Sequence, residues 1–163
     1  MATDNTTRVS LRLKNDVHLA IITAAAAQGT EPATYMQDVL EQAVIEYLPE
    51  ERKRELANTK RLFSLAQGQA RKVFAEGRFT EHFTLTVIQD LMADPEARRL
   101  YEQIIGTDAY ADGVEGKTPL NMYLGWYIKN AISAQPVVDS NGNARRAFVK
   151  NEPIKSYTLL KAA

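Results

Sequence analysis

The segment Thr7-Arg8-Val9-Ser10-Leu11-Arg12-Leu13-Lys14 alternates strictly between polar and apolar side chains. A period of two is that of a β-strand with one buried face, so Val9, Leu11 and Leu13 are expected to face a core. No second strand is predicted within residues 1–48, and an unpaired strand leaves its backbone N–H and C=O groups without partners. A two-fold dimer solves this problem, because residues 8–14 of two copies can pair antiparallel.

Two helices are predicted to follow this strand. Asn15 or Asp16 is a candidate N-cap for the first, an Ala-rich helix that we expect to end at Gly29 in the left-handed conformation. Thr30 is expected to cap the second helix, with Pro32 in its first turn. The second helix is predicted to bury a stripe that ends before Pro49 and comprises Tyr35, Met36, Val39, Leu40, Ala43, Val44 and Leu48.

Residues 7–48 resemble a ribbon-helix-helix DNA-binding domain of the Arc/MetJ type, over just over a quarter of the chain. The resemblance implies a two-stranded ribbon that enters the DNA major groove and reads base edges from its outward face. The residues at the base-reading positions are Arg8, Ser10 and Arg12. In this family the start of the second helix binds a DNA phosphate, which here implies contacts from Thr30 and Ala33. Lys14 is a further candidate phosphate contact.

The rest of the chain is predicted to be mainly helical. Residues 50–76 predict a long connecting helix with a candidate break at Gly68, and two shorter helices are expected over 84–93 and 95–105. Residues 106–117 match neither a calcium loop nor a phosphate-binding loop, so we predict an exposed loop. Thr118 is then expected to cap a strongly apolar helix.

A basic hairpin is predicted after that helix. Two short β-like runs, 137–138 and 144–149, flank a turn that contains Asn141-Gly142, and this dipeptide is a strong hairpin signal. A helix followed by a hairpin is the order found in winged-helix proteins, in which Arg145 and Arg146 would contact DNA phosphate. An equally supported alternative is an oligomerisation or partner-binding domain.

Charge is balanced over the whole chain, with 20 basic and 20 acidic residues, which argues against bulk electrostatic DNA binding. The charges are nevertheless segregated. Residues 52–72 hold seven bases and one acid, residues 76–116 hold three and nine, and residues 117–163 hold seven and two. This distribution predicts faces with different partners.

The chain has no cysteine and only two histidines, His18 and His82. We therefore expect no disulfide, no thiolate nucleophile and no metal or other cofactor. His82 is interpreted as a packing or capping residue, because no Ser or Asp constellation accompanies it. Since no nucleophile–base pair or nucleotide motif is recognised either, enzymatic activity is not expected. Neither a leader peptide nor a membrane span is visible, which predicts a cytoplasmic protein of a prokaryote or a phage.

The predicted fold is mainly α, with a ribbon-helix-helix module over residues 1–48, a connecting helix over 49–77 and a helical domain with a basic hairpin over 78–163. The predicted function is sequence-specific binding of double-stranded DNA by a homodimer or higher homo-oligomer, as a transcriptional repressor. One alternative is a DNA-handling accessory protein for plasmid partition, a relaxosome or phage packaging. Another is an antitoxin or inhibitor whose C-terminal domain binds a second protein.

Overall fold

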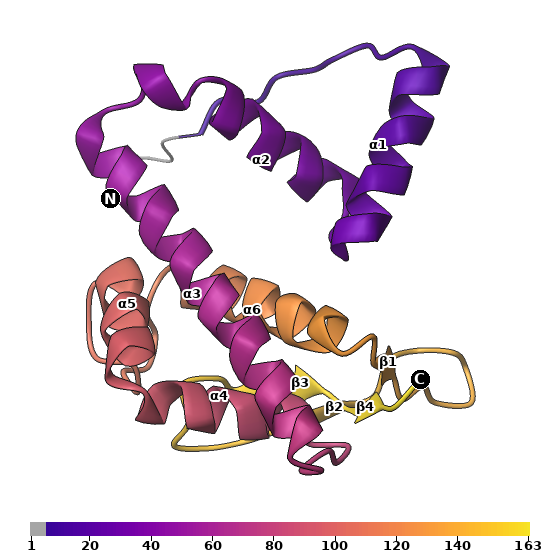
Figure 1. Cartoon of the computed structure of the whole chain (residues 1–163), viewed down its shortest axis with the longest axis vertical. Helices are drawn as coiled ribbons and strands as arrows, with labels where there is room; N and C mark the ends of the chain where they lie inside the picture. The colour runs from indigo at the N-terminus through magenta and orange to yellow at the C-terminus, as the bar shows by residue number, and fades with distance from the viewer. Residues whose placement is uncertain (1–5) are drawn as a thin grey trace. The chain divides into compact units, whose positions relative to one another are not determined.

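The computed structural model describes residues 6–163 and divides the chain into two compact units, Met1–Ala43 and Val44–Ala163. Over these residues the secondary structure is mainly helical, with four short strands in the second unit (Figure 1). No helix within the described range combines the length and the apolar character needed to cross a lipid bilayer.

The first unit contains an extended segment and two helices. Residues 6–14 are extended, and the predicted strand forms no β-ladder with any other segment among residues 6–163. The helices are α1 (Asn15–Gln28) and α2 (Pro32–Ala43). The predicted stop at Gly29 is confirmed, since this residue has φ 67° and its N–H donates to the carbonyl of Ala26 at 3.0 Å.

The side-chain caps predicted for these two helices are wrong. Helix α1 has Lys14 at its N-cap position and begins at Asn15, while the carboxylate of Asp16 accepts only the adjacent N–H of Val17, at 2.9 Å. The hydroxyl of Thr30 is buried without a hydrogen-bond partner, and α2 begins two residues later at Pro32. Thr30 belongs to the end of α1 instead, because its own N–H closes the last turn of that helix.

Helix α2 ends at Ala43, earlier than the apolar pattern predicted. A single 3₁₀ turn, η1 (Ile45–Tyr47), follows, and Leu48 is extended with ψ 150°. A proline disfavours helical geometry in the residue before it, so Pro49 forces the chain out of the helix at this point. The predicted stripe therefore lies partly on α2 and partly on the turn.

Helix α3 (Glu50–Ala75) is the central element of the second unit and runs without interruption through Gly68. It packs against the three remaining helices, which surround it in Figure 1. These helices are α4 (Phe83–Ala93), α5 (Pro95–Ile105) and α6 (Lys117–Ala131). The buried stripe of α3 comprises Leu62, Ala66, Ala70 and Val73. Because this stripe lies within the core, the predicted connecting helix is also a core helix of the second unit.

Helices α5 and α6 begin in different ways. Asp94 caps α5 as predicted, with its carboxylate accepting the N–H of Ala97 at 2.8 Å. The N-cap of α6 is Gly116, with φ 80°, and Thr118 lies inside the helix, so the predicted Thr118 cap is wrong. The prediction of an exposed loop before α6 is also wrong in part, because Ala109 and Lys117 are buried.

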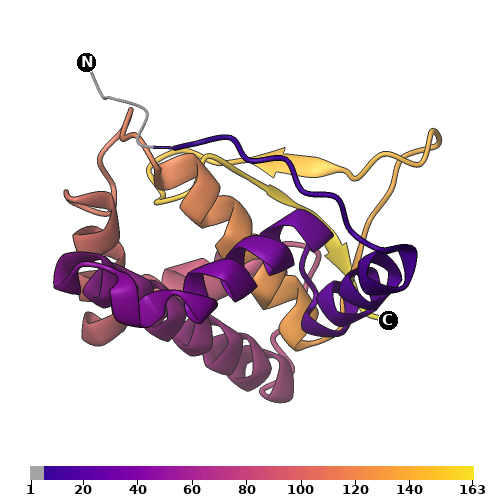
Figure 2. The ribbon, with the colours of Figure 1, turned by 90° about the horizontal axis from the view of Figure 1, so that it is seen from above.

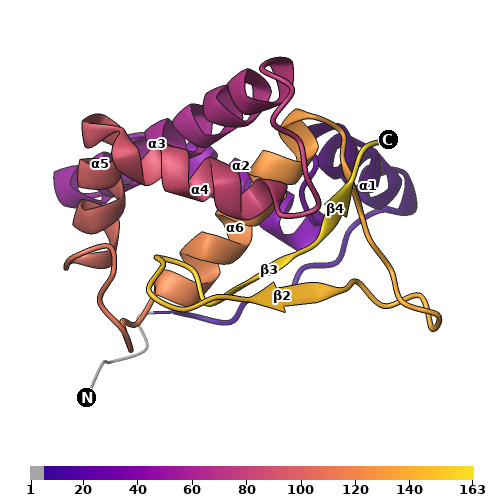
Figure 3. The same cartoon turned by 90° about the horizontal axis from the view of Figure 1, so that it is seen from below.

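The four strands form two small antiparallel pairs beside α6 (Figure 3). Strand β1 (Gln135–Pro136) pairs with β4 (Leu160–Lys161), and β2 (Arg146–Phe148) pairs with β3 (Ser156–Thr158). The predicted hairpin is present but short. Its arms join through a bridge between Val138 and Ala144, after which the second arm pairs with the C-terminal segment instead.

Candidate nucleic-acid interface

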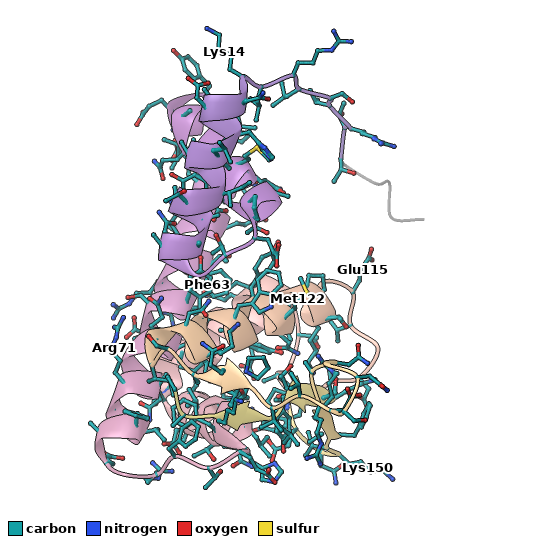
Figure 4. All side chains as sticks on the ribbon, turned by 90° about the vertical axis from the view of Figure 1, so that its right-hand side faces the viewer. Lys14, Phe63, Arg71, Glu115, Met122 and Lys150 are labelled. Carbon is teal, nitrogen blue, oxygen red and sulfur yellow. The ribbon has the colours of Figure 1, made fainter. Side chains whose placement is uncertain are left out.

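The extended segment before α1 presents the predicted ribbon residues on its two sides. Arg8, Ser10 and Arg12 are exposed, and the intervening Val9, Leu11 and Leu13 are also 72%, 61% and 39% exposed. In Figure 4 the side chains of this segment, which leads into Lys14, project away from its backbone. An uncovered apolar row of this kind marks a surface that binds another molecule.

The two helices of the first unit do not supply the missing cover. Ala25 is its one buried apolar residue among positions 6–43. The large apolar side chains that remain exposed on α1 and α2 are Val17, Leu19, Ile22, Val39 and Leu40. A unit with so little buried surface does not offset the entropy lost when its chain becomes ordered. The apolar surface of the extended segment and of both helices is therefore left largely uncovered within this unit.

The start of α2 retains only part of the predicted phosphate site. The N–H of Thr30 donates to the carbonyl of Ala25 at 2.9 Å, which removes it from the predicted contact in this conformation. Ala33 lies in the first turn of α2, where backbone N–H groups lack acceptors within the helix. No acidic residue occupies that turn, although the exposed Glu31 directly precedes it.

Lys14 lies where the extended segment meets α1. Its side chain is exposed, and its carbonyl accepts the N–H of His18 at 3.0 Å, which starts the helix. The residue thus occupies a fixed position next to the predicted base-reading row.

The hairpin loop of the second unit is held in shape by one carboxylate. Asp139 accepts the backbone N–H groups of Asn141 at 2.8 Å and Asn143 at 2.9 Å. The hydrogen bond from the Asn143 backbone is the main cause of a lowered pKa for Asp139. Figure 2 shows this loop projecting from the rest of the second unit. A short polar loop fixed in this way is suited to contact a partner surface.

Arg145 and Arg146 do not lie on one surface. Successive residues of an extended chain point to opposite sides. Nη2 of Arg146 donates to the hydroxyl of Ser156 at 2.7 Å, and its side chain lines a cavity of about 500 Å³. Arg145 is exposed and does not line that cavity. The structure therefore separates the two arginines that the sequence pattern grouped together.

His82 occupies the N-cap position of α4, where its side chain makes no capping bond. Its Nδ1 lies 2.8 Å from the phenolic oxygen of Tyr157, and its Nε2 lies 3.4 Å from a carboxylate oxygen of Glu81. These contacts connect α4 to β3, in keeping with the packing role that the sequence predicted. In residues 6–163 no cluster of three or more His, Asp or Glu side chains is positioned to hold a metal ion.

Two features of the second unit were missed by reasoning from the sequence. The first is the pairing of the C-terminal strands, for which the alternation Ser156-Tyr157-Thr158-Leu159 was an available signal. The second is the burial of Lys117, whose ammonium group donates to the carbonyl of Ala111 in the preceding loop. The chain has no identified relative to guide either assignment: no family model matches it, and no curated protein or solved structure matches it.

Proposed function

We propose that the chain is a homodimeric DNA-binding protein of the ribbon-helix-helix type and acts as a transcriptional repressor. The observation that carries this proposal is the uncovered apolar row Val9, Leu11 and Leu13 on an extended segment without a strand partner. A second copy of the segment provides both missing parts, a hydrogen-bonding strand and an apolar cover. The exposed apolar side chains of α1 and α2 then enter the same dimer interior.

In such a dimer the opposite face of the ribbon carries Arg8, Ser10 and Arg12 twice. A two-stranded ribbon fits the width of the DNA major groove. An arginine there can donate two parallel hydrogen bonds to O6 and N7 of a guanine, and a serine can contact several bases. Lys14 and the start of α2 at Ala33 are the proposed contacts to the flanking phosphates.

The test is binding-site selection followed by affinity measurement with the full-length protein. If Arg12 bonds a guanine, Arg12→Ala costs about 1–3 kcal/mol on the selected site and relaxes the preference at that base pair. Arg12→Lys also weakens binding, since a single ammonium group does not replace the fork. Arg54→Ala, on the exposed surface of α3, is the matched control and keeps the site preference. An unchanged preference in Arg12→Ala would contradict the proposed reading residue.

For the second unit, we propose an auxiliary phosphate contact by Arg145 beside the projecting hairpin loop. The contact is sequence-independent, so Arg145→Ala lowers affinity for all DNA sites alike and reduces the slope of log affinity against log salt by about one per subunit. Parallel salt titrations for wild type and variant would reject the contact. A variant that instead loses higher-order complexes would favour the alternative role in assembly.

A further inference from the structure

The second unit contains a cavity of about 500 Å³ between α6, the loop before it and the C-terminal strands. One face of α6 forms its longest wall, with lining residues repeated every three or four positions: Lys117, Asn121, Gly125, Trp126 and Lys129. The opposite face of the same helix enters the core through Leu120, Leu124 and Ile128. Helix α6 therefore separates a packed interior from an open site of a size that small molecules occupy.

The charge of this cavity has one sign. Four cationic side chains line it, Lys117, Lys129, Arg146 and Lys155, and none of its described lining residues is acidic. The cations come from three separate parts of the chain, the two ends of α6, strand β2 and the loop before β3. The positive end of the α6 dipole also lies at this wall, and its first turn holds no acid. Among these four cations the structure shows one ion pair within the described residues, between Lys155 and Asp112 at 3.5 Å, and both of its side chains are largely exposed.

Lys117 is the most informative member of this group. Its side chain is 8% exposed, and Nζ donates to the carbonyl of Ala111 at 2.6 Å without an ion pair to a described carboxylate. Burial is the main cause that lowers the pKa of Lys117, and the positive charge of Lys155 lowers it further against the opposite effects of Asp112 and Asp108. A buried lysine without an ion pair is stabilised when an anion binds beside it, and the exposed Lys155 lines the same cavity.

The rest of the lining is suited to the body of an organic molecule. Trp126 offers its indole, which the edge-to-face contact with Tyr123 (ring centroids 5.4 Å apart) helps to orient. Ile154 and Met122, the latter labelled in Figure 4, add apolar surface. Ser156, fixed by Arg146, supplies a hydroxyl for hydrogen bonding. At Gly125 an added Cβ would meet no atom within 4 Å, so the middle of the helical wall is open.

We propose that this cavity binds a small organic phosphate, whose phosphate group contacts the lysines and Arg146 and whose flat or apolar body lies against Trp126. Phosphate fits the site because a doubly charged group with several acceptor oxygens can bond several cationic donors and a helix N-terminus at once. Every residue involved belongs to the second unit. Ligand binding at this cavity can therefore be tested separately from DNA binding by the first unit.

The test uses the full-length protein and the fluorescence of Trp126, the single tryptophan of the chain, with calorimetry as a second readout. Phenyl phosphate and adenosine 5′-monophosphate are titrated beside three control compounds. Phenol and adenosine supply the organic body alone, and inorganic phosphate supplies the charged group alone. At least one organic phosphate binds about tenfold more tightly than either of its halves, a difference of about 1.4 kcal/mol. Equal affinity for the uncharged halves, or no binding of either organic phosphate at millimolar concentration, would overturn the proposal.

Matched variants locate the binding. Arg146→Gln and Lys129→Gln each weaken the organic phosphate by about tenfold, whereas Arg145→Gln, on the neighbouring residue that faces away from the cavity, leaves it unchanged. Gly125→Leu fills the open wall and abolishes binding without a loss of charge, and leucine favours a helix more than glycine does. Equal effects of the two arginine variants would place the ligand elsewhere. If Arg146→Gln reduces the salt dependence of DNA binding while no organic phosphate affects Trp126, the cavity faces DNA and the proposal is wrong.

Discussion

The two units of this protein differ in how completely they bury their own apolar residues. In the second unit, the stripe of α3 and the inner faces of α4, α5 and α6 enclose one core, in which Leu62, Phe83 and Leu124 are fully buried. In the described part of the first unit, only Ala25 is buried. Both units have helices of ordinary length and well-defined ends. Secondary structure alone is therefore a poor guide to whether a segment of this chain is stable by itself.

In the proposed dimer, association completes the first unit, and this accounts for the difference. Its apolar residues are arranged as an alternating row on the extended segment and as exposed side chains on the helices. Such a surface costs free energy in water and stabilises a complex when it is covered. Stability measured at several protein concentrations distinguishes a unit that is stabilised by association from one that is stable within a single chain.

The largest expected effect follows Leu11→Asp. In the proposed ribbon this change buries two uncompensated carboxylates, at about 3–5 kcal/mol for each, which is enough to dissociate the dimer and unfold the first unit. Sedimentation measures the dissociation, and circular dichroism measures the lost helix. Ser10→Asp is the matched control on the opposite face. It keeps the dimer but loses DNA affinity, because its carboxylate approaches the phosphates. A monomeric wild type at micromolar concentration would reject the ribbon.

Phe83→Ala tests the other half of the comparison. Phe83 is fully buried and its ring centroid lies 5.1 Å from that of Phe79, so the change leaves a cavity and costs about 3–5 kcal/mol of the unfolding free energy of the second unit. Because this core lies within one chain, its loss of stability is the same at all protein concentrations. Denaturation at two protein concentrations measures the stability of both units. An unfolding transition of the second unit that depends on protein concentration would contradict the expectation that this unit is stable within a single chain.

Alkaline pH sharpens the comparison further, because it acts on a buried phenol of the second unit. Burial raises the pKa of Tyr101 to about 12, against the opposing effect of its 2.8 Å hydrogen bond to Asn121. The raised pKa means that stability is complete below pH 10, the ordinary value, and is lost as pH rises toward 12. The loss amounts to about 2–3 kcal/mol. Denaturation at pH 9 and pH 11.5 measures it, and Tyr101→Phe removes this pH dependence.

Much of the helical fold could be predicted from the sequence, because its signals are local. Asp94 before Pro95 marked the start of α5, and Gly29 marked the end of α1. Among the wrong predictions were the caps at Thr30 and Thr118, where a good capping residue lies near a helix start that the backbone places elsewhere. Capping preference identifies the residue type but does not decide between positions one or two residues apart.

The two candidate sites also differ in how far the sequence predicts them. The alternating row of the extended segment is a property of consecutive residues, so Arg8, Ser10 and Arg12 could be assigned to one face from the sequence. The cavity is assembled from α6, β2 and the chain around Lys155, which are brought together only by folding. Arg145 and Arg146 were grouped as the basic residues of the hairpin, although alternation along an extended run already places neighbours on opposite sides. The burial of Lys117 was also missed, because a lysine at the start of a helix is ordinarily exposed.

A substitution of Thr30 should change stability least, because its buried hydroxyl has no hydrogen-bond partner among residues 6–163. Valine has the same shape without the hydroxyl, so Thr30→Val removes the cost of burying it and stabilises the first unit by about 1 kcal/mol. Chemical denaturation of the dimer measures this gain. Thr30→Ser is the control, because it keeps the hydroxyl and loses a methyl group. If Thr30→Val instead weakens DNA binding while Thr30→Ser does not, the hydroxyl turns toward a phosphate in the complex. Thr30 would then recover the contact that the family resemblance implies, and the start of α2 would have to rearrange when DNA binds.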